Sequence, residues 1–393
     1  MKATKTSLLS AVIILSALIS PVNAYREVID LGTLPGYDHR SIARSINDNG
    51  QIVGDSFNIE SGSQHACLFD STGGGANTDL GTLPGYDYGG TACSINDNGQ
   101  IVGYAYGSSG WQHACLFDST GGGANIDPDP AIVGPPPSSA SCAYSINNKG
   151  QIVGQDHGLA CLFDPTGGGA NINLGALDSF PFTGSVAYSI NDNGQIVGED
   201  YLVGTNRACL FDPTGGGANI NLGGLGGASW ANSNNNNGQI VGSSYNGYPT
   251  HDPPDPILHA CLFDPTGGRV NTDLGALGSG GSEAEFINDE GQIVGYAYDI
   301  SYGGPPFYTP TYSNYRACLF DPTGGGANID LNTLIDPASS WVLTRAYCIN
   351  NSGWIVGCGT NPDGDTHAYL LTPEPTSAVI MAIGVFALRR RRR

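Results

Sequence analysis

Short apolar runs alternate with polar turns along most of the chain, and one such pattern recurs. Residues 46–54 read INDNGQIVG, which places a polar tetrapeptide between two apolar segments. Near-identical copies begin at Ile95, Ile146, Ile190, Asn234, Ile287 and Ile349. Asn-Gly between apolar runs predicts a β-hairpin. With Asn49-Gly50 as a type I′ turn, Ile46 is expected opposite Val53.

Each copy belongs to a larger unit of four apolar segments. A small residue precedes each copy by three positions: Ala43, Ala92, Ala143, Ala187, Ala231, Ala284 and Ala346. A second recurring run, HACLFD at 65–70, follows after a loop, and six copies of it continue into Thr-Gly-Gly. A short segment such as 76–81 closes the unit. Nothing in the unit has helical period, so it predicts four short strands, A to D.

The number and length of the units favour a ring. Seven copies at a spacing of roughly 45–60 residues fit propeller blades better than the shorter coils of a solenoid. The segment 27–31 is a lone fourth strand, and the last unit ends at Leu371 without one. Pairing these two would close the ring and remove its exposed edges. The predicted fold is all-β, a seven-bladed β-propeller of four-stranded blades closed by the N-terminal strand.

Both ends of the chain differ from the repeats. Residues 1–24 carry Lys2 and Lys5, an apolar run and a small-residue site ending at Ala24, which is typical of a secretory signal peptide. A transmembrane anchor is the alternative, although the apolar run is short for one. Residues 373–393 contain Pro373, Glu374 and Pro375, an apolar run and five arginines. We therefore expect three parts: 1–24, a propeller at 25–372, and a tail at 373–393.

Two resemblances follow from these residues. The tail resembles the PEP-CTERM sorting signal of Gram-negative exported proteins. That resemblance implies processing near Pro373, Glu374 and Pro375 by an exosortase, after signal peptidase has acted at Ala24. It also implies transient anchoring in the inner membrane and delivery to the cell surface or the extracellular matrix, as in biofilms. The repeats resemble the extracellular HAF-repeat family through 30–34, 46–54 and 65–66; this implies a fold and a location, and no activity.

Composition narrows the choice of partners. The chain has 15 Lys and Arg against 35 Asp and Glu, a net charge of −20. Such a surface lacks the basic patch that nucleic acid requires. Of the ten cysteines, six occupy one position in strand C of successive units and are expected to be small buried residues. Cys93, Cys142, Cys348 and Cys358 lie elsewhere, and their disulfide pairing stays open.

The loops that join strands B to C and D to A differ in every unit, whereas the other turns repeat. Variable loops on a repeated scaffold usually hold specificity, and here they are rich in aromatic residues. We hypothesise that this face binds a neutral extracellular polysaccharide by ring stacking; the alternative is that these side chains only cover the rim. The candidates are Tyr37, Tyr86, Tyr88, Tyr104, Tyr106, Trp111, Tyr248 and Tyr308.

Other chemistry has weaker support in the sequence. The Asn-Asp-Asn-Gly turns lack the further acidic ligands of a calcium loop, so neither a metal nor another cofactor is expected. A non-enzymatic binding or structural role is the main expectation, and a passive matrix component is one form of it. The alternative is a glycoside hydrolase or lyase that uses Asp252 and Asp255, or Glu283 and Glu285, if the loops assigned to them reach a central opening.

Overall fold

The computed structural model describes residues 25–37, 40–58, 61–107, 110–129, 140–168, 170–178, 183–202, 204–247, 256–268, 270–303 and 309–373. They belong to one compact unit, Tyr25–Pro373. Within these residues the secondary structure is 27 β-strands and two 3-10 helices, η1 (Leu331–Thr333) and η2 (Pro337–Ser339), which confirms the all-β class. The expected signal peptide with Ala24, and the tail from Glu374 onward with Pro375, lie outside the described residues. So do Tyr248, Tyr308, Asp252 and Asp255.

Four separate sheets each contain four antiparallel strands in sequence order, as the repeat predicts. We call the strands of one repeat a module. The first of these sheets contains β9 (Ser141–Ile146), β10 (Ile152–Asp156), β11 (Leu159–Phe163) and β12 (Ile172–Gly175). The second contains β13 (Gly184–Ile190), β14 (Ile196–Leu202), β15 (Thr205–Phe211) and β16 (Ile220–Gly223). The third contains β17 (Ser229–Asn234), β18 (Ile240–Tyr245), β19 (Leu258–Phe263) and β20 (Thr272–Gly275). The fourth contains β21 (Gly281–Ile287), β22 (Ile293–Tyr302), β23 (Pro310–Phe320) and β24 (Ile329–Asp330).

The remaining eleven strands form three modules that are linked by single parallel pairs, Arg40 with Thr366 and Gln64 with Gly89. One module contains β2 (Arg40–Ile46), β3 (Ile52–Phe57), β4 (Gln64–Phe69) and β5 (Thr78–Asp79). The next contains β6 (Gly89–Ile95), β7 (Ile101–Tyr106) and β8 (Gln112–Phe117), with a bridge from Leu116 to Ile126 in place of a fourth strand. The last contains β25 (Val342–Ile349), β26 (Ile355–Thr360) and β27 (Thr366–Pro373).

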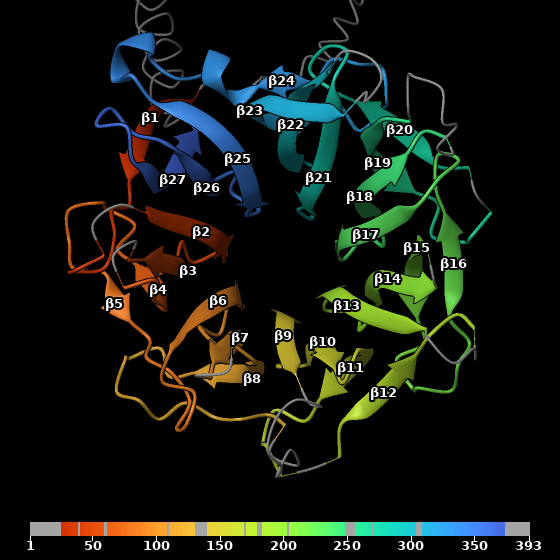
Figure 1. The fold of residues 1–393 in the computed structure, drawn as a ribbon, viewed down its shortest axis with the longest axis horizontal. Coiled ribbons are helices and arrows are strands. Elements are labelled where there is room, and N and C mark those ends of the chain that lie inside the picture. Colours follow the sequence, from red (N-terminus) through yellow and green to blue (C-terminus); the bar gives the residue numbers. More distant parts are fainter. Residues whose placement is uncertain are drawn as a thin grey trace, which may run out of the picture. The chain divides into compact units, whose positions relative to one another are not determined.

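The first strand completes the last module. β1 (Tyr25–Asp30) pairs antiparallel with β27, and Val28 lies opposite Leu371. The expected pairing of the opening strand with the final repeat is therefore present. Figure 1 shows the modules arranged around a common centre, with β2, β6, β9, β13, β17, β21 and β25 as the strands nearest to it.

The core lies between neighbouring modules. Val197 and Ala208 of one sheet pack against Ile240, Cys261 and Phe263 of the next, and all five are buried. Because each module buries its apolar residues only against its two neighbours, the same residue types recur at the same positions. The strand-C cysteines are part of this core, as expected, and burial raises the pKa of their thiols. All ten cysteines are free, including Cys93, Cys142, Cys348 and Cys358.

The turn between the first two strands differs from the prediction. The Gly50 amide donates to the Asn47 carbonyl at 3.1 Å, and the Asn47 amide donates to the Gln51 carbonyl at 3.1 Å. Gly50 has a φ of 77°, whereas Asn49 does not have positive φ. A type I′ turn needs positive φ at both central residues, so that expectation is wrong. The register also moves by one residue, and Ile46 lies opposite Ile52.

The contact between the chain's first and last strands, β1 and β27, includes an ion pair. His367 Nδ1 lies 2.9 Å from Asp30 Oδ1, in the place that His65 and Asp79 occupy within the module of β2 to β5. Burial works to raise the pKa of Asp30, but hydrogen bonds from His367 and the Gly32 amide outweigh it and lower that pKa. The hydrogen bond to Asp30 raises the pKa of His367, against the effect of burial.

Asp30→Asn should therefore destabilise the protein most at pH 5. The Asp30 part of the pair stabilises above the carboxyl's unfolded pKa and is lost as the pH falls through its lowered folded pKa. The His367 part is present below the imidazole's unfolded pKa and is lost as the pH rises through its raised folded pKa. We expect a loss below about 1 kcal/mol at pH 5, because the Asp30 side chain is 39% exposed, and less at pH 8.

The measurement is the urea unfolding midpoint of wild type and variant at both pH values. Glu27→Gln removes the same charge from the same strand, at an exposed position, and serves as the control. Equal shifts in the two variants at every pH would show that the pair contributes nothing.

Candidate functional site

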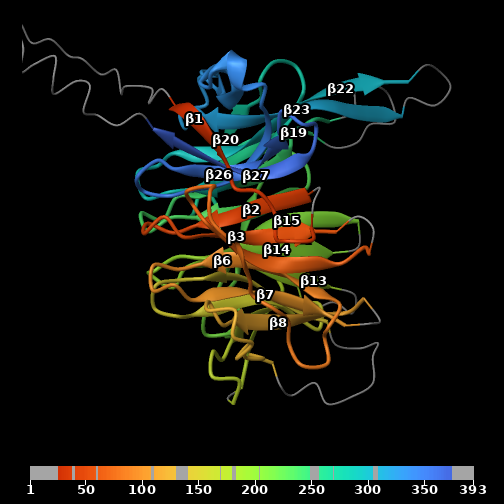
Figure 2. The same cartoon turned by 90° about the vertical axis from the view of Figure 1, so that its left-hand side faces the viewer.

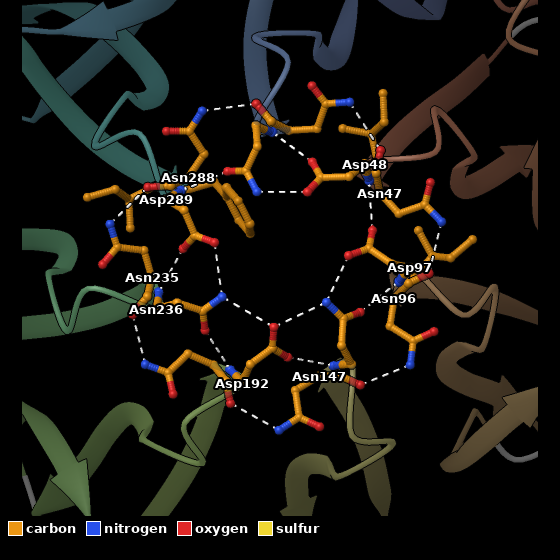
Figure 3. A pocket seen from close by; sticks show the side chains of 18 of the residues that line it. Asn47, Asp48, Asn96, Asp97, Asn147, Asp192, Asn235, Asn236, Asn288 and Asp289 are labelled. Atoms are coloured by element: carbon orange, nitrogen blue, oxygen red, sulfur yellow. Dashed lines mark hydrogen bonds between the residues drawn. The ribbon is translucent and has the colours of Figure 1, made fainter.

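The repeated turns meet at one end of the centre and bind one another. The amide of the second turn residue in each module donates to the side-chain oxygen of the corresponding residue in the next, at 2.7–2.9 Å. The cycle runs through Asp48, Asp97, Asn148, Asp192, Asn236, Asp289 and Asn351 and returns to Asp48 (Figure 3). Seven turns are thus joined without a break.

A second cycle lies beside the first. The side-chain amide of the first turn residue donates to the main-chain carbonyl of its counterpart in the next module, at 2.8–3.1 Å. Its members are Asn47, Asn96, Asn147, Asn191, Asn235, Asn288 and Asn350, all buried. These bonds satisfy buried polar atoms and join the modules, which explains the repetition of this tetrapeptide without a ligand.

Acidic and amide side chains alternate around the first cycle. Asn148 donates to Asp97 and Asp192, and Asn236 donates to Asp192 and Asp289. These bonds place an amide between carboxylates that would otherwise repel one another. The alternation cannot be complete in a ring of seven. It fails between Asp48 and Asp97, which are neighbours in the cycle.

Away from the turns, each innermost strand contains a β-bulge at the same position. The residue after the recurring Ala has no partner in the register, as between Ala187 and Ser189, where Tyr188 is the extra residue. The extra residues are Arg44, Cys93, Tyr144, Tyr188, Asn232, Glu285 and Tyr347. A bulge breaks the two-residue period of a strand and redirects a side chain. Five residue types occupy the bulged position, with Tyr in three modules, whereas the Ala before it recurs in all seven.

The bulged residues line one cavity of about 600 Å³. Six more side chains complete it: Tyr104, Trp230, Ser243, Tyr245, Leu258 and Glu283. Six of the thirteen lining residues are therefore aromatic, and this volume lies within the range of pockets that bind small ligands. On the turn side the centre holds a separate hollow of about 150 Å³, lined by the turn residues, the last residue of each innermost strand and Phe286.

The aromatic rings of the cavity contact one another in sequence. The ring centroid of Tyr144 lies 6.4 Å from that of Tyr104 and 5.8 Å from that of Tyr188. Trp230 and Tyr245 meet edge to face at 6.0 Å. Burial raises the pKa of the Tyr144 and Tyr188 hydroxyls, so these groups remain uncharged hydrogen-bond donors and acceptors.

Two carboxylates of β21 enter the same cavity. Glu283 accepts a hydrogen bond from the Tyr296 hydroxyl at 2.6 Å. Burial, then repulsion from Glu283, raises the pKa of Glu285 to about 7, although Arg345 and Arg44 act in the opposite direction. Burial also raises the pKa of Glu283. Glu285 therefore gains or loses its proton near neutral pH.

The nearby cations are held by other partners. Arg44 donates to Asp55 from Nε at 3.1 Å and from Nη2 at 3.3 Å. The Arg345 guanidinium lies 4.4 Å from the Tyr296 ring centroid and 5.1 Å from that of Tyr315. Because Asp55 already neutralises Arg44, the cavity presents aromatic faces, hydroxyls and two carboxylates.

The aromatic residues expected to form a binding face lie in different places. Tyr104 lines the cavity, and Tyr106 packs edge to face on it at 5.4 Å. Tyr37 packs on His65 at 5.1 Å, and Tyr86 packs on His113 at 4.7 Å, outside the cavity lining. Tyr88 and Trp111 are exposed, 65% and 39%, and also lie outside it. Pro373 ends β27 opposite Tyr25.

Sequence reasoning placed Glu283 and Glu285 in a loop, and this was wrong. Both lie on β21, and both line the cavity. Arg44, Tyr144, Tyr188, Trp230 and Tyr347 were not predicted. The signal available was variation directly after the recurring Ala, within a strand that otherwise repeats.

Two kinds of feature are absent from the residues that the structure describes. No group of three or more His, Cys, Asp or Glu side chains there is arranged to hold a metal ion. Within the same residues, no helix has the length and apolar character to cross a membrane.

The chain was compared with known protein families and with curated proteins. Residues 85–158 match a family described as a protein of unknown function (DUF3466). The matched segment contains β6 to β10 and two of the bulged residues, Cys93 and Tyr144. No curated protein matches this chain.

Proposed function

We propose that the chain is an exported, non-enzymatic β-propeller of seven blades that binds a neutral glycan in its central cavity. Two closed cycles of seven hydrogen bonds and the β1–β27 pairing support the seven-bladed fold. We further propose that the repeats belong with the HAF-repeat proteins and that 25–372 form one domain.

The observation that carries the binding function is the cavity of bulged residues. Seven equivalent positions vary in identity while they face one space, and aromatic residues occupy much of its wall. Sugars stack their C–H faces on aromatic rings, and their hydroxyls bond to groups such as Asn232, Ser243 and Glu283. A net charge of −20 disfavours anionic ligands, so a neutral glycan fits best.

The location rests on the two ends of the sequence. We propose that signal peptidase acts after Ala24 and that an exosortase recognises Pro373, Glu374 and Pro375. The arginines at the end of the chain would keep the tail transiently in the inner membrane. The protein would then reach the surface or the matrix of a Gram-negative-type bacterium.

Replacing Tyr104 and Tyr188 together by Ala should weaken glycan binding at least about tenfold, because each ring supplies a stacking face in the cavity. Purified mature protein would be screened on an array of neutral glycans, and the bound ones would be measured by calorimetry. Trp111→Ala is the matched control, since it removes an exposed aromatic residue outside the cavity and should leave affinity unchanged. Equal losses in both variants, with circular dichroism unchanged, would place the site elsewhere; no binding by wild type would favour a passive matrix component.

A second function, glycan hydrolysis or elimination, is favoured by the carboxylate pair. Glu285, with a pKa of about 7 beside Glu283, has the protonation behaviour that a general acid requires. New reducing ends or unsaturated products after incubation of the bound glycans with the protein would favour this function. Binding without product would favour the first.

A further inference from the structure

A second hollow lies beside the central cavity and shares part of its wall. It measures about 260 Å³, and Tyr245 and Leu258 line both spaces. The rest of its lining includes Tyr298, Ile300, Tyr302 and Tyr312 from the β22–β23 hairpin. The two spaces therefore adjoin at the end of β18 and the start of β19.

The β22–β23 hairpin is longer than its counterparts. β22 has 10 residues and β23 has 11, whereas the second and third strands of the other modules have 5 to 8. Figure 2 shows these two strands projecting beyond the other sheets. The extra length carries Ile300, Tyr302 and Tyr312 of the second hollow, so this one module extends the central site outward.

The aromatic surface continues from the cavity to the hairpin. Trp230 contacts Tyr245 at 6.0 Å, and Tyr298 contacts Tyr312 edge to face at 5.5 Å. Tyr312 is 48% exposed, so its ring is accessible. None of the residues that line the second hollow is charged. A hollow of 260 Å³ is below the usual size of an independent ligand site, which favours an extension of the larger one.

We propose that the ligand is a linear neutral oligosaccharide or polysaccharide segment that occupies both spaces. One end lies in the central cavity, and the chain passes Tyr245 and Leu258 to reach the hairpin, where Tyr312 stacks on a further sugar ring. This inference rests on the proposed glycan-binding function and adds a requirement for chain length. The uncharged walls of the second hollow select neutral sugar residues, and the outward path selects a polymer over a free monosaccharide.

The test is calorimetry with neutral oligosaccharides of one to six residues from the glucose, mannose and N-acetylglucosamine series. For the series that binds, affinity for wild type should rise with length. Tyr312→Ala should lower affinity for the longer members about tenfold and leave the shortest bound member unchanged. Tyr88→Ala, which removes another exposed tyrosine, should bind like wild type. Tyr312→Lys, as a second variant, places a charge on the path and should act like Tyr312→Ala.

The outcomes separate the extension from the cavity. Affinity that does not depend on length, or an equal loss for short and long members in Tyr312→Ala, would overturn the extension while leaving the central site in place. Failure of all three series to bind would count against the extension and the glycan-binding function together.

Discussion

Replacing Glu285 by Gln is expected to stabilise the protein at pH 8 and to leave its stability at pH 5 nearly unchanged. The pKa of Glu285 rises from 4.5 to about 7 on folding, because burial in the cavity and the charge of Glu283 disfavour ionisation. At pH values between these two pKa values, the folded state keeps a proton on Glu285 that the unfolded state releases. Stability therefore falls as the pH rises through this window. A shift of this size corresponds to at most about 3 kcal/mol, and Gln avoids the loss.

The measurement is the free energy of unfolding in urea at pH 5 and pH 8 for wild type and Glu285→Gln. Glu290→Gln is the control, because it changes an exposed carboxylate on the following turn of the same module. We expect the Glu290 variant to follow wild type at both pH values. Parallel curves for wild type and Glu285→Gln would show that Glu285 ionises in the folded protein as it does in the unfolded chain.

The raised pKa has a consequence for the proposed site. Below pH 7 the Glu285 carboxyl can donate a hydrogen bond to a sugar hydroxyl, and above pH 7 it can only accept. A carboxylate that weakens the fold at the centre is more readily explained by ligand contact than by structure, because natural proteins tend to retain destabilising groups at functional sites.

The modular architecture could be read from the sequence because each repeat contains its own strand signals. Ile52, Val53 and Phe69 pack between modules, and their counterparts in the other repeats do the same. The lone β-segment at 27–31 predicted the pairing with β27. These features follow from the local pattern of apolar and polar residues and from the count of strands in each repeat, which shows which strand lacks a partner. Both can be read from the sequence.

The site could not be read in the same way, because a bulge reverses the inside-outside order of a strand. Alternation alone gives no reason to place Tyr144 or Tyr188 at the centre, and variation was expected in loops. Tyr37 and Tyr86 illustrate the opposite case, in which a residue of a variable connection does not belong to the site. Their rings pack on His65 and His113, outside the cavity lining. The turn register was missed for a related reason, since the Asn47 side chain bonds to Gln51 and to the next module.

One feature of the sequence indicates the bulge: the glycine that ends each Gln-Ile-Val-Gly run. A methyl group at Gly198 would lie 1.9 Å from the Val186 carbonyl oxygen, and Gly54, Gly103 and Gly154 face the same main-chain oxygen in their own modules at 1.8–1.9 Å. These oxygens belong to the residue before the recurring Ala, directly beside the bulge. The glycine is therefore required by the close approach of two main chains, since any Cβ would displace the bulged strand.

Gly198→Ala should accordingly destabilise the protein by about 3 kcal/mol or more and weaken glycan binding through displacement of Tyr188. The contact is with main chain on both strands, so no side-chain rotation can relieve it. Gly168→Ala is the matched control: its new Cβ would lie 3.7 Å from Thr166 Oγ1 at an exposed turn, and we expect little change. Urea unfolding midpoints and glycan affinity would be measured for both variants. If Gly198→Ala unfolded at the wild-type urea concentration, the bulge could shift freely, and the innermost strands would not hold the cavity residues in place as the proposed site requires.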